Sequence, residues 1–237
     1  MGDRPIIFSG PMIRALLAGT KTQTRRVLKP QPPEGYRYTG VHYASYEPSS
    51  WFFNGPHSGH KVRQVYDEGD LLWVREGWQA PAMDDHLSPR DMPPGLARRY
   101  LADGSEVVGF GADTVWQPIG AAGRGRPSIH MPRWASRLTL TVGQVAVERL
   151  QDITEEAAQA EGVCHFVEQH ERSGSWAGLS SADRALLIGQ IYGSSRKAFQ
   201  HLWETLHGTE AWEANPWVVV ISFATTPANI DSLPEQP

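Results

Sequence analysis

The sequence predicts a mixed α+β protein, and three observations support this fold class. Short apolar runs, such as residues 71–74 and 217–221, have the length and composition of buried strands. Residues 12–17 and 199–206 instead carry apolar side chains at helical spacing. Long connections rich in proline and glycine separate such segments. We therefore expect one small mixed β-barrel with flanking helices and long loop insertions.

The beginning of the chain predicts a strand, a helix and an extended segment. The apolar residues 5–8 favour a strand. Ser9 and Pro11 mark the start of a helix, because serine caps helices and proline is tolerated in the first turn. Gly19 is a helix-ending residue, so the polar residues 21–26 should leave the helix in an extended form.

The rest of the chain predicts further strands and helices in a similar way. Residues 71–76 favour a buried strand, and residues 136–150 alternate apolar and polar side chains as a half-buried strand does. Thr154 is a natural N-cap for a short helix that ends near Gly162. The remaining expected elements are a helical piece within residues 168–195, a helix from residue 199 to Gly208, and a barrel-closing strand at residues 216–223.

A single domain is expected over residues 1–225, because no change in composition separates two halves. Insertions are expected at about residues 30–68, 80–130 and 165–195, where proline, glycine and polar residues accumulate. The first insertion should be a loop with one hairpin. Residues 226–237 are expected to form a disordered tail.

Composition excludes several classes of protein. The net charge of −4 and the pI near 6.1 are not those of a non-specific duplex-binding protein, so contacts with nucleic acid should be local. Cys164 is the single cysteine, which rules out an internal disulfide framework. Apolar runs are far shorter than the roughly 20 residues of a membrane span, and no leader pattern is present. We expect a cytoplasmic protein without membrane contact.

The segment Leu17–Arg26, which reads LAGTKTQTRR, resembles the signature of ASCH domains, a group whose fold is similar to the RNA-binding PUA domains. The resemblance continues in three further segments and covers about half of the chain. These segments are Gly69–Glu76, Leu150–Gly162 and Trp203–Phe223. The long connections between them resemble the enlarged, prophage-associated form of the domain. The resemblance thus implies a PUA-like barrel.

Some small ASCH proteins are amidohydrolases that remove the acyl group from N4-acetylcytidine with a threonine nucleophile, a lysine base and a glutamate. Their Lys-x-x-Thr pattern after the first helix matches Lys21 and Thr24, and their glutamate matches Glu161. The chemistry needs these residue types, because a threonine hydroxyl is a poor nucleophile until a base takes its proton. A lysine in a desolvated pocket can have a pKa low enough to act as that base.

Other residues are candidates for substrate contact. Arginines after the helix can stabilise an oxyanion, and the end of the strand at residues 71–76 suits a ligand contact. The proline-bounded segment 126–134 carries side chains that stack on bases or pair with phosphate. No histidine or cysteine accompanies His130 at ligand spacing, so neither a metal nor a cofactor is predicted. The expected substrate-binding residues are Arg25, Arg26, Trp73, Glu76, His130 and Arg133.

Three functions remain open. The first is a hydrolase of an acylated or otherwise modified cytidine nucleoside, and the second is an RNA-binding module without catalysis. The third is an ASCH-type, metal-assisted ribonuclease, which the resemblance also implies. The expected partner is therefore a modified nucleoside or single-stranded RNA, and no protein partner is predicted. Each candidate residue also has an ordinary structural interpretation: Lys21 as a helix-end cation, Thr24 as a strand residue and Glu161 as a solvated helix-end carboxylate.

Overall fold

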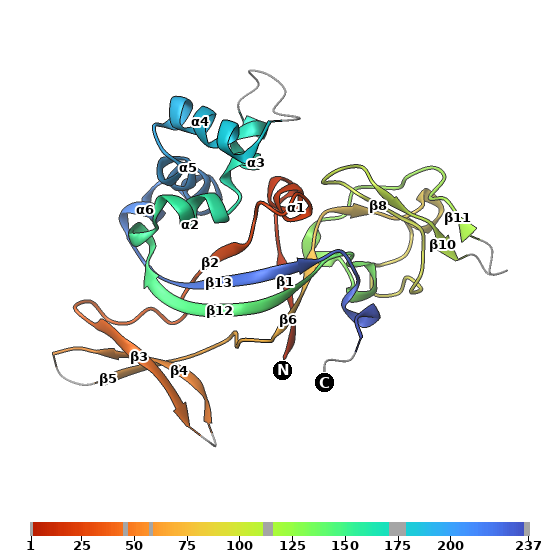
Figure 1. Cartoon of the computed structure of the whole chain (residues 1–237). Helices are drawn as coiled ribbons and strands as arrows, with labels where there is room; N and C mark the ends of the chain where they lie inside the picture. The colour runs from red at the N-terminus through yellow and green to blue at the C-terminus, as the bar shows by residue number, and fades with distance from the viewer. Residues whose placement is uncertain (1, 45–46, 57–58, 111–115, 171–178, 235–237) are drawn as a thin grey trace. The chain divides into compact units, whose positions relative to one another are not determined.

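The computed structural model describes residues 2–44, 47–56, 59–110, 116–170 and 179–234 (Figure 1). The chain divides into two compact units where the sequence predicted a single domain. Unit 1 comprises residues 1–2, 20–70 and 142–224, and unit 2 comprises residues 3–19, 71–141 and 225–237. Each unit is assembled from separated stretches of chain, so no linker of distinct composition marks the division. None of the helices within the described ranges combines the length and apolar character needed to cross a membrane.

The α+β class is confirmed, and the main sheet is open. Strand β1 pairs in parallel with β6, whereas β12 pairs with β6, and β2 with β13, in antiparallel fashion. The expected closed barrel is not found, because β1 and β2 stay as the two edges and no pairing joins them in the part of the chain described. The strand order is β1 (Asp3–Ile7), β6 (Leu71–Arg75), β12 (Thr139–Arg149), β13 (Trp217–Thr226) and β2 (Gln23–Val27).

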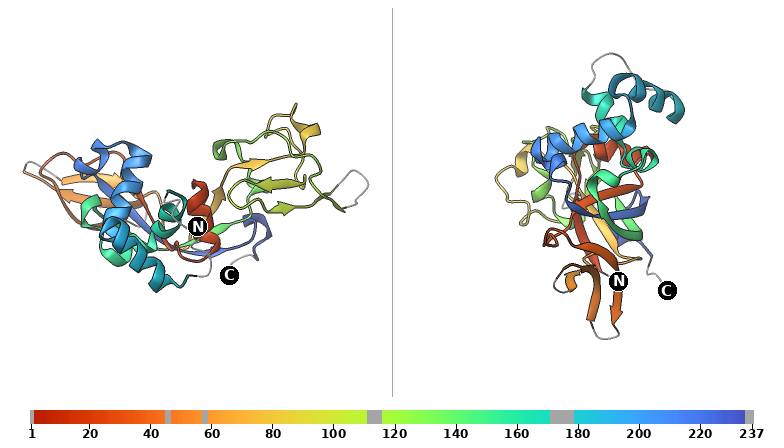
Figure 2. Two further views of the ribbon diagram at one scale, coloured as in Figure 1. Left: turned by 90° about the horizontal axis from the view of Figure 1, so that it is seen from above. Right: turned by 90° about the vertical axis from the view of Figure 1, so that its left-hand side faces the viewer.

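In unit 1, helices lie on one side of strands β12, β13 and β2, as Figures 1 and 2 show. Thr154 caps α2 as predicted, its hydroxyl accepting a hydrogen bond from the Ala157 N–H. Helix α5 buries Phe199, Leu202 and Trp203 along one face, which explains its predicted amphipathic pattern. The helices are α2 (Glu155–Ala160), α3 (Val163–His170), α4 (Ser181–Tyr192), α5 (Ser195–His207) and α6 (Glu210–Glu213).

The insertion predicted at residues 30–68 forms a regular three-stranded antiparallel sheet. Its strands are β3 (Arg37–Ala44), β4 (Glu47–Asn54) and β5 (Gly59–Arg63), on the side of the main strands opposite to the helices (Figures 1 and 2). Trp51 and Phe53 are buried, and Tyr38 packs edge-on against Trp51. Aromatic packing between strands therefore organises a segment whose composition predicted a loop with one hairpin.

Unit 2 contains the predicted first helix, α1 (Gly10–Leu17), with Pro11 in its first turn. The insertion predicted at residues 80–130 builds small sheets of its own. The first sheet has three strands, β7 (Trp78–Gln79), β8 (Arg98–Tyr100) and β9 (Glu106–Val107). The second pairs β10 (Gly109–Phe110) with β11 (Trp116–Gln117). Their core is a cluster of Trp78, Ala80, Met92, Tyr100, Met131 and Ala135.

Residues 226–234 differ from the disordered tail that the sequence predicted. Strand β13 runs to Thr226, and Ile230 is buried in a short 3₁₀ turn. The Asn229 side-chain amide donates hydrogen bonds to the backbone carbonyls of Arg133, at 2.9 Å, and Ser136, at 2.7 Å. These bonds hold a segment whose polar composition alone gave no sign of packing. The described residues do not include residues 235–237 of this tail or residues 171–178 of the third predicted insertion.

Candidate functional site

The candidate site in unit 1 is built where the start of β2 meets the end of α2. Glu161 is the C-cap residue of α2, and Lys21 lies two residues before β2. An isolated antiparallel bridge pairs Lys21 with Glu161, and the Thr22 N–H donates to the Ala160 carbonyl at 2.9 Å. The backbone itself therefore brings together two residues that are 140 positions apart.

The Lys21 ammonium is buried, with 2% of the residue exposed, and is held by three acceptors. Nζ donates to Glu161 Oε2, to the Glu161 carbonyl and to the Gln23 carbonyl, each at 2.8 Å. An ammonium group has three protons to donate, so these bonds match its full capacity. The lysine is thus anchored in one position by its own strand and by the end of α2.

Arg25 extends this arrangement into a buried network of alternating charges. Its Nη1 donates to the second carboxylate oxygen of Glu161 at 3.1 Å. Its Nη2 and Nε donate to Glu148 Oε1, on β12, at 2.7 and 2.9 Å. Glu161 therefore bridges two cations, and Glu148 adds a second carboxylate, so the charges of Lys21 and Arg25 are balanced inside the protein.

Burial lowers the pKa of Lys21 from its ordinary value of 10.5. The charge of Glu161 and its hydrogen bond oppose this effect, while Arg26 and Arg25 add to it. Burial also lowers the pKa of Arg26, with smaller opposing contributions from Tyr66 and Glu161. The neutral amine of Lys21 is therefore closer in free energy to the ammonium than in a lysine exposed to water.

Thr24 is placed differently from Lys21 and Glu161. It is buried, with 3% exposed, and its cross-strand partner is the fully buried Ile221. Successive side chains of a strand point to opposite faces, so Thr24 lies on the face of β2 opposite to Gln23 and Arg25, whose side chains hydrogen-bond to each other. Within the described residues, no hydrogen bond joins the Thr24 hydroxyl to Lys21 or Glu161.

The remaining predicted substrate-binding residues, apart from Arg25 and Arg26, belong to unit 2. Trp73 is buried in β6, and the guanidinium of Arg75 lies 4.5 Å from its ring centre. Arg133 forms ion pairs of 2.8 Å with Asp3 and with Asp231. His130 lines a pocket that is described below. The predicted site residues are therefore divided between the two units.

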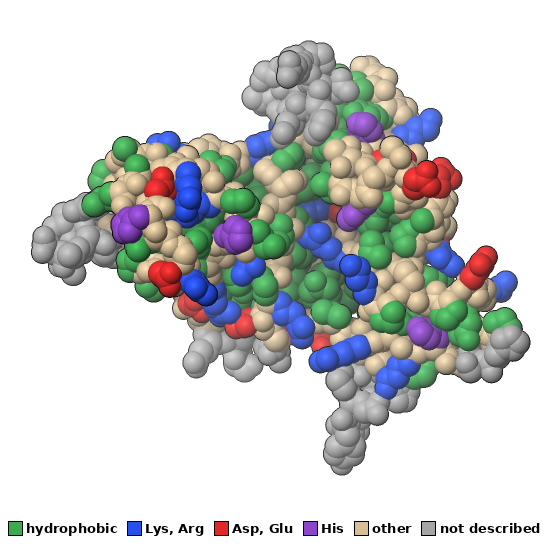
Figure 3. Space-filling view, turned by 180° about the vertical axis from the view of Figure 1, so that it is seen from behind, with side chains coloured by type: hydrophobic (Ala, Val, Ile, Leu, Met, Phe, Trp, Pro, Cys, Tyr) green, Lys and Arg blue, Asp and Glu red, His purple; other side chains and the backbone are tan. Residues whose placement is uncertain are grey.

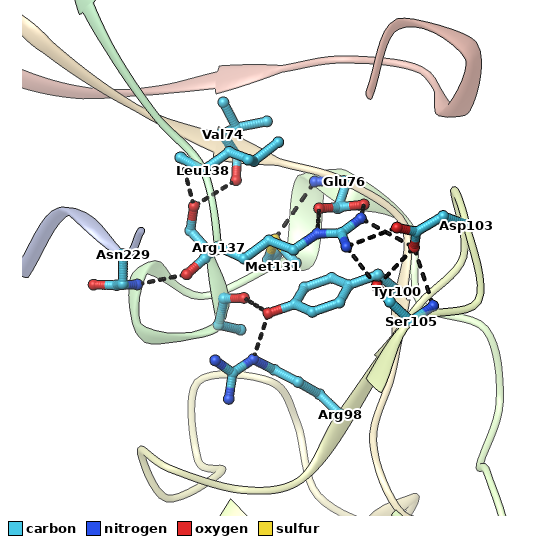
Figure 4. A network of polar contacts seen from close by, with 12 residues as sticks. Val74, Glu76, Arg98, Tyr100, Asp103, Ser105, Met131, Arg137, Leu138 and Asn229 are labelled. Atoms are coloured by element: carbon cyan, nitrogen blue, oxygen red, sulfur yellow. Dashed lines mark hydrogen bonds and ion pairs between the residues drawn. The ribbon is translucent and has the colours of Figure 1, made fainter. Parts of the chain in front are cut away.

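Glu76 is the centre of a network in unit 2 that sequence reasoning missed (Figure 4). Arg137 donates from Nε and Nη2 to the two carboxylate oxygens of Glu76, at 2.8 and 2.9 Å. Arg137 also donates to Asp103 at 3.0 Å, and its guanidinium lies 4.0 Å from the Tyr100 ring centre. The only signal in the sequence is a lone arginine at the start of the strand predicted at residues 136–150.

The pKa shifts in this network follow from burial and pairing. Burial raises the pKa of Glu76, and Arg137 opposes that shift. Burial alone would lower the pKa of Arg137, but its hydrogen bonds to Glu76 and Asp103 raise it. Glu76 is 1% exposed and both of its oxygens are taken by Arg137. This geometry fits a structural ion pair, with no part of the carboxylate presented to a ligand.

Metal-ligating residues do not gather at either place: the part of the chain that is described contains no group of three or more His, Cys, Asp or Glu side chains placed to hold a metal ion. Comparison of the chain with protein families, curated proteins and solved structures found no match.

Proposed function

We propose that this chain is an enlarged ASCH-type protein of PUA-like fold, and that unit 1 hydrolyses the acyl amide of an acylated or otherwise modified cytidine nucleoside. The observation that carries the proposal is the buried ion pair of Lys21 and Glu161. Burial lowers the pKa of this lysine, and a lysine that acts as a base near neutral pH needs a lowered pKa. The LAGTKTQTRR segment supports the same assignment, and the mixed α+β class agrees with it.

In the proposed reaction, Thr24 Oγ attacks the acyl carbonyl carbon while its proton passes to the neutral amine of Lys21. The tetrahedral intermediate collapses, the bond between the acyl carbon and N4 breaks, and Lys21 returns the proton to the departing amine. Water then hydrolyses the acyl ester of Thr24, giving one proton to Lys21, which passes it to the released Thr24 oxygen. Glu161 holds Lys21 in position throughout.

This chemistry places two demands on the geometry. A neutral amine has two protons, so Lys21 must release one of its three acceptors and turn its lone pair toward the nucleophile. The Gln23 carbonyl is the acceptor to release, because it belongs to the peptide that precedes Thr24. Thr24 lies on the other face of β2, so we infer that the start of β2 shifts locally when substrate binds.

The charge balance around Lys21 and Arg25 favours binding of a small neutral substrate over binding of RNA. Lys21 and Arg25 are both neutralised by carboxylates, the buried Glu161 and the half-buried Glu148, so neither offers free positive charge to phosphate. On the face seen in Figure 3, lysine and arginine side chains lie in small groups among hydrophobic and acidic ones. We assign Arg25 the role of positioning Glu161, in place of the substrate contact that the sequence predicted.

We place the protein in the cytoplasm, where thiols stay reduced. Cys164 is a free thiol, in keeping with that setting.

The decisive experiment is incubation of the protein with N4-acetylcytidine while the release of acetate and cytidine is followed. N4-acetylcytidine should be consumed, and unacylated cytidine should bind without reaction. Binding of single-stranded RNA measured on the same preparation separates the two classes of function. Tight RNA binding without turnover of any N4-acylcytidine would favour the binding module instead.

A further inference from the structure

Unit 2 contains a pocket of about 740 Å³ that is separate from the Lys21 cluster, because every residue that lines it belongs to unit 2. Four arginines and one histidine line it, and its lining includes no aspartate or glutamate. The basic residues are Arg75, Arg90, Arg124, Arg126 and His130. So many cationic side chains around one hollow would repel one another unless an anion or nearby carboxylates balance them.

The carboxylates near the pocket balance only part of this charge. Arg126 pairs with Asp85 at 3.1 Å, and Arg90 lies 3.8 Å from Asp91 in a pair exposed to solvent. Arg75 and Arg124 form no ion pair with any residue that the structure describes. Two of the lining arginines are therefore not paired with any carboxylate of the described residues.

Two of these arginines, Arg75 and Arg126, are held in place before any ligand arrives. Arg75 lies against the Trp73 ring and donates from Nη1 to the Ile129 carbonyl at 3.2 Å. Arg126 is 4% exposed, and two backbone hydrogen bonds with Trp78, of 2.8 and 3.1 Å, fix its position. The Nε atoms of Arg75 and Arg126 are both buried and have no hydrogen-bond partner among the described residues. Buried N–H groups without an acceptor are costly, and a ligand oxygen would supply one.

Much of the rest of the lining consists of prolines and apolar side chains. Pro127 and Pro132 bracket a 3₁₀ turn at Ser128–His130, and Met131 is buried beneath it. Ile129 is an exposed apolar side chain at the pocket. A volume of about 740 Å³ greatly exceeds that of a bare phosphate and falls in the range of pockets for small organic ligands. The lining thus suits a molecule with both an anionic group and a flat or apolar part.

We propose that this pocket binds a phosphate-bearing nucleotide, with Arg75, Arg124 and Arg126 on the phosphate and the segment Pro127–Pro132 against the base and sugar. The guanidinium group of arginine donates paired N–H groups to phosphate oxygens, so a pocket lined by several arginines is suited to bind phosphate. The proposal does not rest on the function proposed for unit 1. The same phosphate can belong to a free nucleotide or to single-stranded RNA.

The test is titration of the whole chain with AMP, with adenosine and with a short single-stranded RNA, by calorimetry at low salt. The key variant is Arg124→Gln, because Arg124 is exposed and its backbone N–H, which donates to Asp85, is kept. The matched control is Arg63→Gln, which removes the same charge from an exposed position of unit 1. Thermal unfolding of both variants confirms that each is folded.

AMP should bind, and adenosine, which lacks the phosphate, should bind at least about tenfold more weakly. Arg124→Gln should also weaken AMP binding at least about tenfold, because a hydrogen bond between charged groups contributes on that scale. Arg63→Gln should leave it unchanged. If only the RNA binds, and Arg124→Gln weakens RNA binding, the pocket is still a phosphate site and the phosphate belongs to a nucleic-acid strand. Equal binding of AMP and adenosine, equal effects of the two substitutions, or no binding of either phosphate ligand would overturn the proposal.

Discussion

Glu161 holds Lys21 with two different oxygen atoms, its carboxylate Oε2 and its own backbone carbonyl, each 2.8 Å from Nζ. The carbonyl contact survives any substitution of the glutamate side chain, whereas the charge does not. Substitutions at position 161 therefore change the electrostatics of the lysine while leaving much of its placement intact.

Glu161→Gln should lower the free energy of unfolding by about 3–5 kcal/mol, because Lys21 and Arg25 would lose a buried carboxylate. Equilibrium urea unfolding measures the change. The double variant Lys21→Met/Glu161→Gln should lose less than the sum of the two single variants. Strictly additive losses would show that the two side chains do not stabilise each other.

The rate of deacylation should rise with pH through the lowered pKa of Lys21 and then level off, because only the neutral amine can accept the Thr24 proton. Initial rates on N4-acetylcytidine between roughly pH 6 and 10 give this profile. Lys21→Arg keeps the charge but cannot act as a base, so turnover should vanish. Normal turnover in Lys21→Arg would remove the lysine from the mechanism.

The same lysine should make stability depend on pH in a defined direction. Its pKa is lower in the folded chain than the ordinary 10.5, so between the two values the unfolded chain binds more protons. The contribution of Lys21 to stability should therefore be least favourable below the folded pKa and should improve as the pH rises toward 10.5. The difference in unfolding free energy between the wild type and Lys21→Met, measured across that range, isolates this contribution.

Thr24→Val should abolish deacylation and keep the fold, since valine is also β-branched and fits a strand beside Ile221. We expect a change in unfolding free energy within about 1 kcal/mol. Trp203→Ala, on the buried face of α5, should instead cost about 3–5 kcal/mol. Thermal or urea unfolding combined with the activity assay separates the two effects, and an active Thr24→Val protein would show that the hydroxyl is not the nucleophile.

Arg137→Met should lower the free energy of unfolding near pH 7 by about 3–5 kcal/mol, because Glu76 would keep a buried charge without its partner. The loss should shrink as the pH falls, since burial already raises the pKa of Glu76 and protonation removes the charge. Arg99→Met is the control, because its partner Glu106 is about one third exposed and such pairs contribute about 0–1 kcal/mol. Equal losses in both variants would contradict the importance of burial.

The strands and helices that could be predicted were those whose pattern is local. The apolar run of β6 and the helical spacing of α5 lie within one stretch of chain, so each was visible in the sequence. Sheet β3–β4–β5 was missed because its stability comes from aromatic contacts between strands, such as Tyr38 with Trp51. Such contacts leave no periodic signal in any one segment.

The candidate site was accessible to prediction only through the ASCH resemblance, because Lys21 and Glu161 are 140 positions apart. The ion-pair partner of Glu76 could not be predicted for the same reason, because it is distant in the sequence. Arg75 is adjacent to Glu76 in the sequence, but successive residues of a strand point to opposite faces, and Arg75 lies against Trp73. The true partner, Arg137, comes from 61 positions away.

Both units are made of interleaved stretches of chain, and this has a consequence for biosynthesis. Unit 2 takes its last segment from residues 225–237, where Asn229 donates to the carbonyls of Arg133 and Ser136. Unit 1 likewise needs residues up to 224, including strand β13. A ribosome that has made two thirds of this chain has therefore completed neither unit. Neither unit can be complete before the segment from β13 to Asn229 has been made, so the two units cannot form one after the other along the chain.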